Sequence, residues 1–89
     1  MVGIISGGFL PNIEITALRV SDDSQLINRS IRDVKFRKNY GVTLVAIKRK
    51  DKIIDHPEPN EIFKKGDIAY VLGKPEQIAY AIELFLTER

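Results

Sequence analysis

Most of the basic side chains of this sequence lie in one stretch. Residues 29–52 contain nine arginines and lysines against two aspartates, a local net charge of +7, whereas the whole chain of 89 residues carries +2. Positive charge at this density can bind a phosphate-bearing ligand or nucleic acid. Phe36 and Tyr40 lie within the stretch, and an aromatic ring beside an arginine can stack on a base while the guanidinium holds a phosphate. The alternatives are a solvated basic rim and two rings packed in the core.

Residue types that perform catalysis are few and isolated. The single histidine, His56, lies near Asp55 and Glu58 in a proline-rich loop, and the chain has no cysteine. One histidine without a partner indicates an exposed loop residue rather than a metal ligand or a general base. The adjacent carboxylates Asp22 and Asp23 fit a solvated turn. We therefore predict a protein that is not an enzyme and has no metal or prosthetic cofactor.

The strands that would position these groups follow from the spacing of apolar residues. Alternation predicts a half-buried strand that begins at Ile13, with Ile15 and Ala17 on its buried side. Leu18 and Val20 fall on the other phase, which indicates a bulge or coverage of both faces near the end of this strand. Residues 42–47 and 68–72 are apolar on nearly every position, as expected for central strands. A short strand at residues 52–54 precedes two prolines, which interrupt regular pairing.

Two helices complete the predicted fold. Ser30 and Asp33 have capping-box spacing, and Gly41 suits a helix end, so the first helix lies between them. Pro75 suits the first turn of the second helix. Its expected buried stripe consists of Ile78, Ile82, Phe85 and Leu86. Two helices packed on one face of a small mixed or antiparallel sheet give an α+β fold.

Length and composition indicate one small domain. Residues 1–12, with three glycines and a proline, are predicted to be a tail or a linker remnant, and residues 13–89 form the domain. A chain this short buries little surface and has no cysteine for a disulfide, so we expect a homodimer. The sequence has neither a signal-peptide pattern nor the roughly 20 consecutive apolar residues of a membrane span. We expect a cytoplasmic protein that reaches the inner membrane only through a transporter.

Four stretches of the sequence, taken in order, resemble the RCK C-terminal domain, also called the TrkA C-terminal domain. They are residues 26–31 (LINRSI), 40–49 (YGVTLVAIKR), 57–59 (PEP) and 66–73 (GDIAYVLG). The resemblance extends from about residue 13 to residue 86. It implies a regulatory module, commonly dimeric, that acts on potassium channels, potassium uptake systems or cation/proton antiporters. The glycine-rich half that binds NAD or ATP in such proteins is absent from this sequence.

The resemblance also implies a ligand site, because some members bind cyclic di-AMP at the dimer interface. Carried over to this chain, the contact residues are Ile31, Arg32, Lys35, Phe36, Arg37, Lys38, Thr43 and Leu44, with Pro59 closing the pocket. Arg37 matches the arginine of the binders and would hold a phosphate. At four other positions, where the binders have aspartate, isoleucine, alanine and asparagine, this chain has Lys35, Phe36, Lys38 and Thr43, respectively. The alternative function is a nucleic-acid-binding accessory domain that uses residues 29–52.

Overall fold

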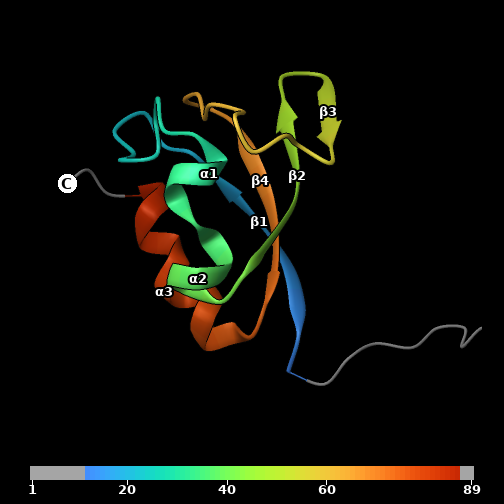
Figure 1. Cartoon of the computed structure of the whole chain (residues 1–89), viewed down its shortest axis with the longest axis vertical. Coiled ribbons are helices and arrows are strands. Elements are labelled where there is room, and N and C mark those ends of the chain that lie inside the picture. The colour runs from blue at the N-terminus through green and yellow to red at the C-terminus, as the bar shows by residue number, and fades with distance from the viewer. Residues whose placement is uncertain (1–11, 87–89) are drawn as a thin grey trace, which may run out of the picture.

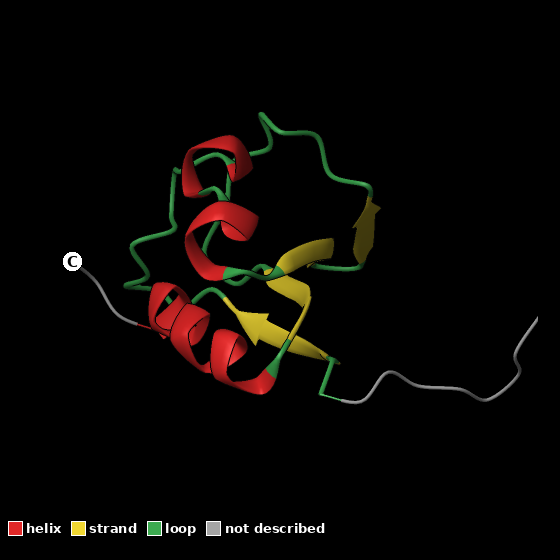
Figure 2. Ribbon diagram, turned by 60° about the horizontal axis from the view of Figure 1, so that its bottom comes forward, coloured by secondary structure: helices red, strands yellow, loops and turns green. Residues whose placement is uncertain are grey.

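Four antiparallel strands and three helices make up the structure, a computed structural model that describes residues 12–86. The strands are β1 (Glu14–Arg19), β2 (Thr43–Arg49), β3 (Lys52–Asp55) and β4 (Ile68–Gly73). The helices are α1 (Ile31–Val34), α2 (Phe36–Tyr40) and α3 (Pro75–Leu86). All three helices lie on one side of the sheet, which confirms the predicted α+β class (Figures 1 and 2). The predicted tail, apart from Asn12, lies outside the described residues.

The sheet has the strand order β1-β4-β2-β3. The two strands predicted to be central, β2 and β4, pair with each other and each has a second partner. A shift in register between Leu44 and Ala46 leaves Val45 as an extra residue in β2, and its side chain is 42% exposed. Beyond this bulge, β2 and β3 form a hairpin that projects at the upper end of Figure 1.

The first predicted helix is divided into two short helices. Its start is confirmed, because the Ser30 hydroxyl accepts a hydrogen bond from the Asp33 backbone N–H at 3.1 Å. Its end is also confirmed, because Gly41 has a φ of 73° and donates to the Arg37 carbonyl at 3.0 Å. Between these points Lys35 adopts a left-handed conformation with φ 54°, which ends α1 and redirects the chain into α2. The redirected helix buries Phe36 among the core residues.

The core lies between the helices and the inner face of the sheet. Phe36 packs edge-on to Phe63 with ring centroids 5.8 Å apart, and it stacks against Phe85 at 6.4 Å. Ser24 is also buried: its hydroxyl donates to the Leu84 carbonyl at 2.6 Å and accepts from the Leu26 N–H at 3.0 Å. The other buried apolar residues are Leu18, Val20, Val34, Val42, Ile47, Ala69, Val71, Ile78 and Ala81.

Two predictions about buried faces are wrong. In β1 the buried residue is Leu18, whereas Ile15 is 62% exposed and Ala17 is also exposed. Apolar residues occupy both faces of this strand, so their alternation identifies a strand but not the face that is buried. The pairing of Leu18 with the buried Ala69 determines which face points to the core. In α3 the residue predicted to be buried, Leu86, is 60% exposed, because Ala81 and Leu84 occupy the core-facing positions.

Candidate functional site

The predicted ligand residues are brought together by backbone hydrogen bonds between α1 and the loop that follows β3. The Arg32 N–H donates to the Pro59 carbonyl at 2.9 Å, and the Ile31 N–H donates to the Glu61 carbonyl at 3.0 Å. Ser30 also forms an isolated antiparallel bridge with Ile62. These contacts hold the proline-bearing loop against the first turn of α1. Pro59 is thereby placed beside Arg32.

Most of the predicted residues share an accessible surface, which we call the α1–α2 surface. It comprises Ile31, Arg32, Lys35, Arg37, Lys38 and Pro59; of the two predicted residues on β2, Thr43 lies opposite Leu72 on the uncovered face of the sheet and Leu44 packs against the core. Within the α1–α2 surface, Ile31 is half-buried and the other five residues are exposed. The ninth predicted residue, Phe36, is 4% exposed and belongs to the core beneath this surface. Its ring is therefore not available to stack on a base, and the core interpretation of Phe36 is confirmed.

Four basic side chains on the α1–α2 surface are not neutralised by the protein. Within residues 12–86, the side chains of Arg32, Lys35, Arg37 and Lys38 form no ion pair and no hydrogen bond. Four cations within seven residues of chain repel one another and attract an anion. The surface can therefore accept a ligand with two negative charges without first breaking an internal salt bridge.

Arg49 organises the base of the loop, and the sequence analysis did not find this role. Its Nε and Nη2 donate to the two carboxylate oxygens of Asp67, both at 2.9 Å, and its Nη1 donates to Glu61 Oε2 at 2.9 Å. Nη2 also donates to the Ile62 carbonyl at 3.0 Å. The hydrogen bonds that Arg49 donates to Asp67, and secondarily to Glu61, raise the pKa of Arg49 despite the opposing effect of burial. Glu61 thus joins Arg49 to the backbone of α1.

Asp67 fixes a turn and also pairs with Arg49. Its carboxylate accepts a hydrogen bond from the Lys64 backbone N–H at 2.9 Å, which fixes the turn before β4. The side chain is only 1% exposed, so its charge is balanced almost entirely by Arg49. Eighteen residues separate the two partners in sequence. Only the pairing of β2 with β4 shows that they meet.

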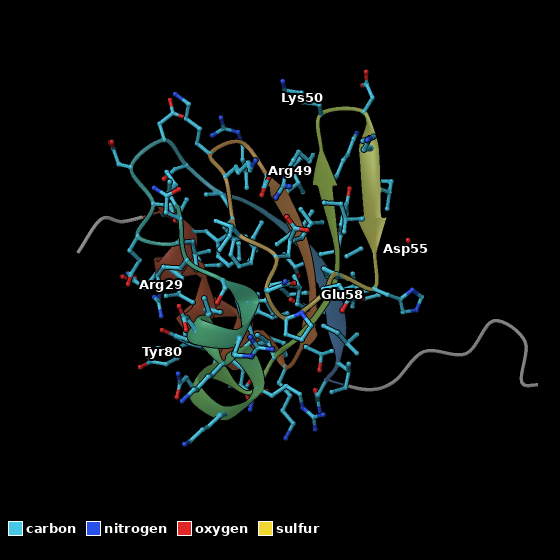
Figure 3. All side chains as sticks on the ribbon, turned by 45° about the horizontal axis from the view of Figure 1, so that its top comes forward. Arg29, Arg49, Lys50, Asp55, Glu58 and Tyr80 are labelled. Atoms are coloured by element: carbon cyan, nitrogen blue, oxygen red, sulfur yellow. The ribbon has the colours of Figure 1, made fainter. Side chains whose placement is uncertain are left out.

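The basic segment does not form one continuous surface. Its first half lies on and near α1 and α2, whereas its second half lies at the end of the β2–β3 hairpin; Figure 3 shows Arg29 and Lys50 in these two places. At the hairpin, Lys50 and Lys52 share a pocket with Lys64 and Lys65, which lie outside the segment. A long basic groove, the feature that would favour nucleic-acid binding, is therefore not formed by residues 29–52 alone.

Two other residues singled out in the sequence have local contacts. Tyr40 pairs with Tyr80 across α2 and α3, with ring centroids 5.1 Å apart. His56 is 94% exposed, with Nδ1 lying 3.8 Å from an oxygen of Asp55. Across residues 12–86 there is no group of three histidine, cysteine, aspartate or glutamate residues that could hold a metal.

The face of the sheet opposite the helices carries an apolar patch that no residue from 12 to 86 covers, bordered by polar residues such as Arg19 and Lys48. Register places Ile15 opposite Leu72 and Ala17 opposite Tyr70, and residues directly opposite each other share a face. On the hairpin, Ile53 is 56% exposed. Contiguous apolar residues on an open sheet face are typical of a protein–protein contact. No helix in the described chain, residues 12–86, has the length and apolar character needed to cross a membrane.

This fold and these two surfaces define a small α+β module that has an open apolar face and an anion-attracting surface. Comparison with known proteins identifies the family. Residues 15–86, more than half of the chain, match the model of the TrkA-C domain. The chain belongs to this family, which confirms the resemblance seen in the sequence.

Relatives with curated descriptions are longer proteins. The chain is 32% identical over 69 residues to "Probable potassium channel protein 2" of Methanocaldococcus jannaschii, covering 78% of this chain and 20% of that protein. It is 29% identical over 80 residues to "Ktr system potassium uptake protein C" of Bacillus subtilis, covering 85% of this chain and 36% of that protein. The chain therefore spans a fifth to about a third of the length of these relatives.

Solved structures share the fold closely. The RCK C domain of the potassium transport protein KtrA, in complex with cyclic di-AMP, has a TM-score of 0.74 and 28% identity, covering 80% of this chain and 81% of that one. The RCK_C domain dimer of S. agalactiae BusR, also in complex with cyclic di-AMP, has a TM-score of 0.75 and 27% identity, covering 83% and 91%. BusR has also been solved with promoter DNA, and this chain covers 35% of that BusR chain.

Proposed function

We propose that this chain is a regulatory module of potassium or other cation transport that acts as a homodimer and binds a small anionic ligand. Cyclic di-AMP is the candidate ligand, and the α1–α2 surface is its candidate site. The proposal is supported by membership of the TrkA-C family and by the two similar domains solved with cyclic di-AMP. The channel, uptake system or antiporter that the module would regulate is part of the same proposal.

The observation that carries this proposal is the set of four unpaired cations beside a fixed loop. The described chain supplies no counter-ion for Arg32, Lys35, Arg37 and Lys38, and a backbone hydrogen bond holds Pro59 beside Arg32. The phosphates of a cyclic dinucleotide would supply the missing negative charge. Arginine suits this role because its guanidinium can donate two parallel hydrogen bonds to a phosphate.

Dimerisation would convert ligand binding into a signal. In an isologous dimer each α1–α2 surface has a symmetry mate, and a ligand that contacts both copies stabilises one relative orientation of them. The open apolar face of the sheet offers surface that a second copy could bury.

The test is isothermal titration calorimetry of the purified chain with cyclic di-AMP, together with light scattering for its mass. We expect a dimer that binds one ligand per two chains. Arg37→Ala should weaken binding at least tenfold, because a charge-assisted hydrogen bond contributes about 1.5–3 kcal/mol. Lys74→Ala is the matched control, since it removes one exposed positive charge just before α3.

Binding that is equally weak in both variants would show that attraction to net charge, rather than the α1–α2 surface, holds the ligand. A dimer that releases no heat with cyclic di-AMP, and whose melting temperature the dinucleotide leaves unchanged, would rule out this ligand. A monomer at high concentration would rule out the dimeric mechanism. For nucleic acid, the measurement is retention of a DNA duplex as salt is raised, because counterion release makes such binding fall steeply with salt.

A further inference from the structure

Two turns that are distant in sequence enclose a second, strongly basic pocket. One is the β2–β3 turn and the other is the turn that precedes β4. The pocket between them has a volume of about 720 Å³. It is lined by Arg49, Lys50, Asp51, Lys52, Lys64, Lys65, Gly66 and Asp67, and we call it the lysine pocket. Figure 3 shows Arg49 and Lys50 at this end of the molecule, away from Arg29 on the helical side.

The charges of the lysine pocket are unbalanced. Five of its lining residues are basic and two are acidic, a net charge of +3. One carboxylate, that of Asp67, is buried and fully engaged by Arg49 and by the Lys64 backbone N–H. Asp51 is the remaining carboxylate of the lining. Four lysine side chains, which form no ion pair with any residue from 12 to 86, therefore face the pocket with one exposed negative charge among them.

The backbones that carry these lysines are held in place. Arg49 and Asp67 form the floor, and their bidentate pairing joins the end of β2 to the start of β4. The Gly66 N–H donates to the Val20 carbonyl at 2.8 Å, and the Asp67 N–H donates to the Lys64 carbonyl at 3.1 Å. Gly66 has a φ of 86°, a conformation that glycine adopts without strain. Binding an anion here would cost little ordering of the backbone.

We propose that the lysine pocket binds a ligand carrying two or more phosphate charges. Lysine ammonium groups act as compact point charges with three rotatable donors, so several of them can surround a phosphate without a fixed geometry. A single monovalent anion would contact the lysines of only one turn, whereas two linked phosphates can contact the lysines of both turns. A free polyphosphate or the headgroup of an acidic phospholipid has this chemistry. The site uses none of the residues of the α1–α2 surface.

The experiment titrates the full chain with sodium pyrophosphate at constant ionic strength and follows binding by calorimetry. Lys52→Gln with Lys65→Gln removes one lysine from each turn. Arg19→Gln with Lys74→Gln removes the same charge from exposed residues outside both basic surfaces and is the matched control. We expect pyrophosphate to bind about tenfold more weakly to the pocket variant and less than about twofold more weakly to the control. Circular dichroism shows that each variant is folded.

A second arm distinguishes the two sources of phosphate. Phosphatidylcholine vesicles with and without phosphatidic acid are sedimented with each variant. Pyrophosphate binding that depends on the pocket supports a free ligand, and retention on phosphatidic acid that depends on the pocket supports a lipid headgroup. Equal losses in the two double variants, or no binding to either probe, would overturn this assignment. Cyclic di-AMP titrated into these proteins and into Lys35→Gln with Lys38→Gln separates this result from the proposed function, because that binding should fail only in the Lys35/Lys38 variant.

Discussion

Replacing Asp67 with asparagine tests whether the Arg49 network stabilises the fold. The asparagine keeps the shape of the side chain but removes its charge and turns one acceptor oxygen into a donor. Asp67 is 1% exposed and accepts three hydrogen bonds, two of them from Arg49. Breaking a buried ion pair on one side costs about 3–5 kcal/mol. Arg49 is 22% exposed and retains Glu61, so we expect a smaller loss of about 2–4 kcal/mol.

A loss of this size is readily measured. A domain of 89 residues has an unfolding free energy of about 5–13 kcal/mol, so the variant should lose a large part of its stability. The assay is urea unfolding followed by far-UV circular dichroism, at one protein concentration because dimerisation adds to apparent stability. Asp22→Asn is the control, since its pair with Arg19 is 3.6 Å long and more than half exposed. It should change stability by less than about 0.5 kcal/mol.

The same network sets an expectation for pH. The hydrogen bonds that Arg49 donates to Asp67 raise the pKa of Arg49, so the stabilisation is complete below the pKa of an unfolded arginine and is lost only above it. Both values lie far above neutrality. The difference in unfolding free energy between wild type and Asp67→Asn should therefore be constant from about pH 6 to about pH 9. Equal urea midpoints for Asp67→Asn and Asp22→Asn, with unchanged slopes, would refute the reasoning.

Two further substitutions test the core and the open face. Ser24→Ala removes the bond to the Leu84 carbonyl and leaves the buried Leu26 N–H without an acceptor, so urea unfolding should show a loss of about 1–2 kcal/mol; no loss would mean that water replaces the hydroxyl. Ile15→Lys should lower the dimer mass in light scattering, because it places a charge on the apolar sheet face, whereas Leu86→Lys, equally exposed on α3, should leave the mass unchanged. Equal masses in the two variants would move the interface away from the sheet.

Local chemistry made much of the fold predictable. Ser30 and Gly41 bound the first helical region because a cap and a left-handed glycine act within one turn of chain. Residues 42–47 and 68–72 are predicted to be central strands because apolar residues occupy both of their faces, and β2 and β4 are the two inner strands of the sheet. The turn role of Asp67 follows in the same way from its contact with Lys64, three residues away.

The remaining features depend on contacts between distant residues. The buried side of β1 is decided by its pairing with β4, since apolar residues lie on both sides of the strand. The interruption of the helix at Lys35 allows Phe36 to pack in the core against Phe63 and Phe85. Residue spacing and helix propensity within residues 30–41 do not reveal these contacts, because Phe63 and Phe85 are distant in the sequence.

In the candidate site, too, the residue types can be predicted from the sequence, whereas their placement depends on contacts between distant residues. The resemblance selects Arg32 and Pro59 as ligand contacts, but their proximity depends on a loop whose far side is held by Glu61. Glu61 gives its carbonyl to α1 and its carboxylate to Arg49, so one residue joins the loop to both the helices and the sheet. Arg49 in turn forms the floor of the lysine pocket. The α1–α2 surface and the lysine pocket are therefore both connected to the hydrogen-bonded network of Arg49, Asp67 and Glu61. The Asp67 substitution perturbs this network.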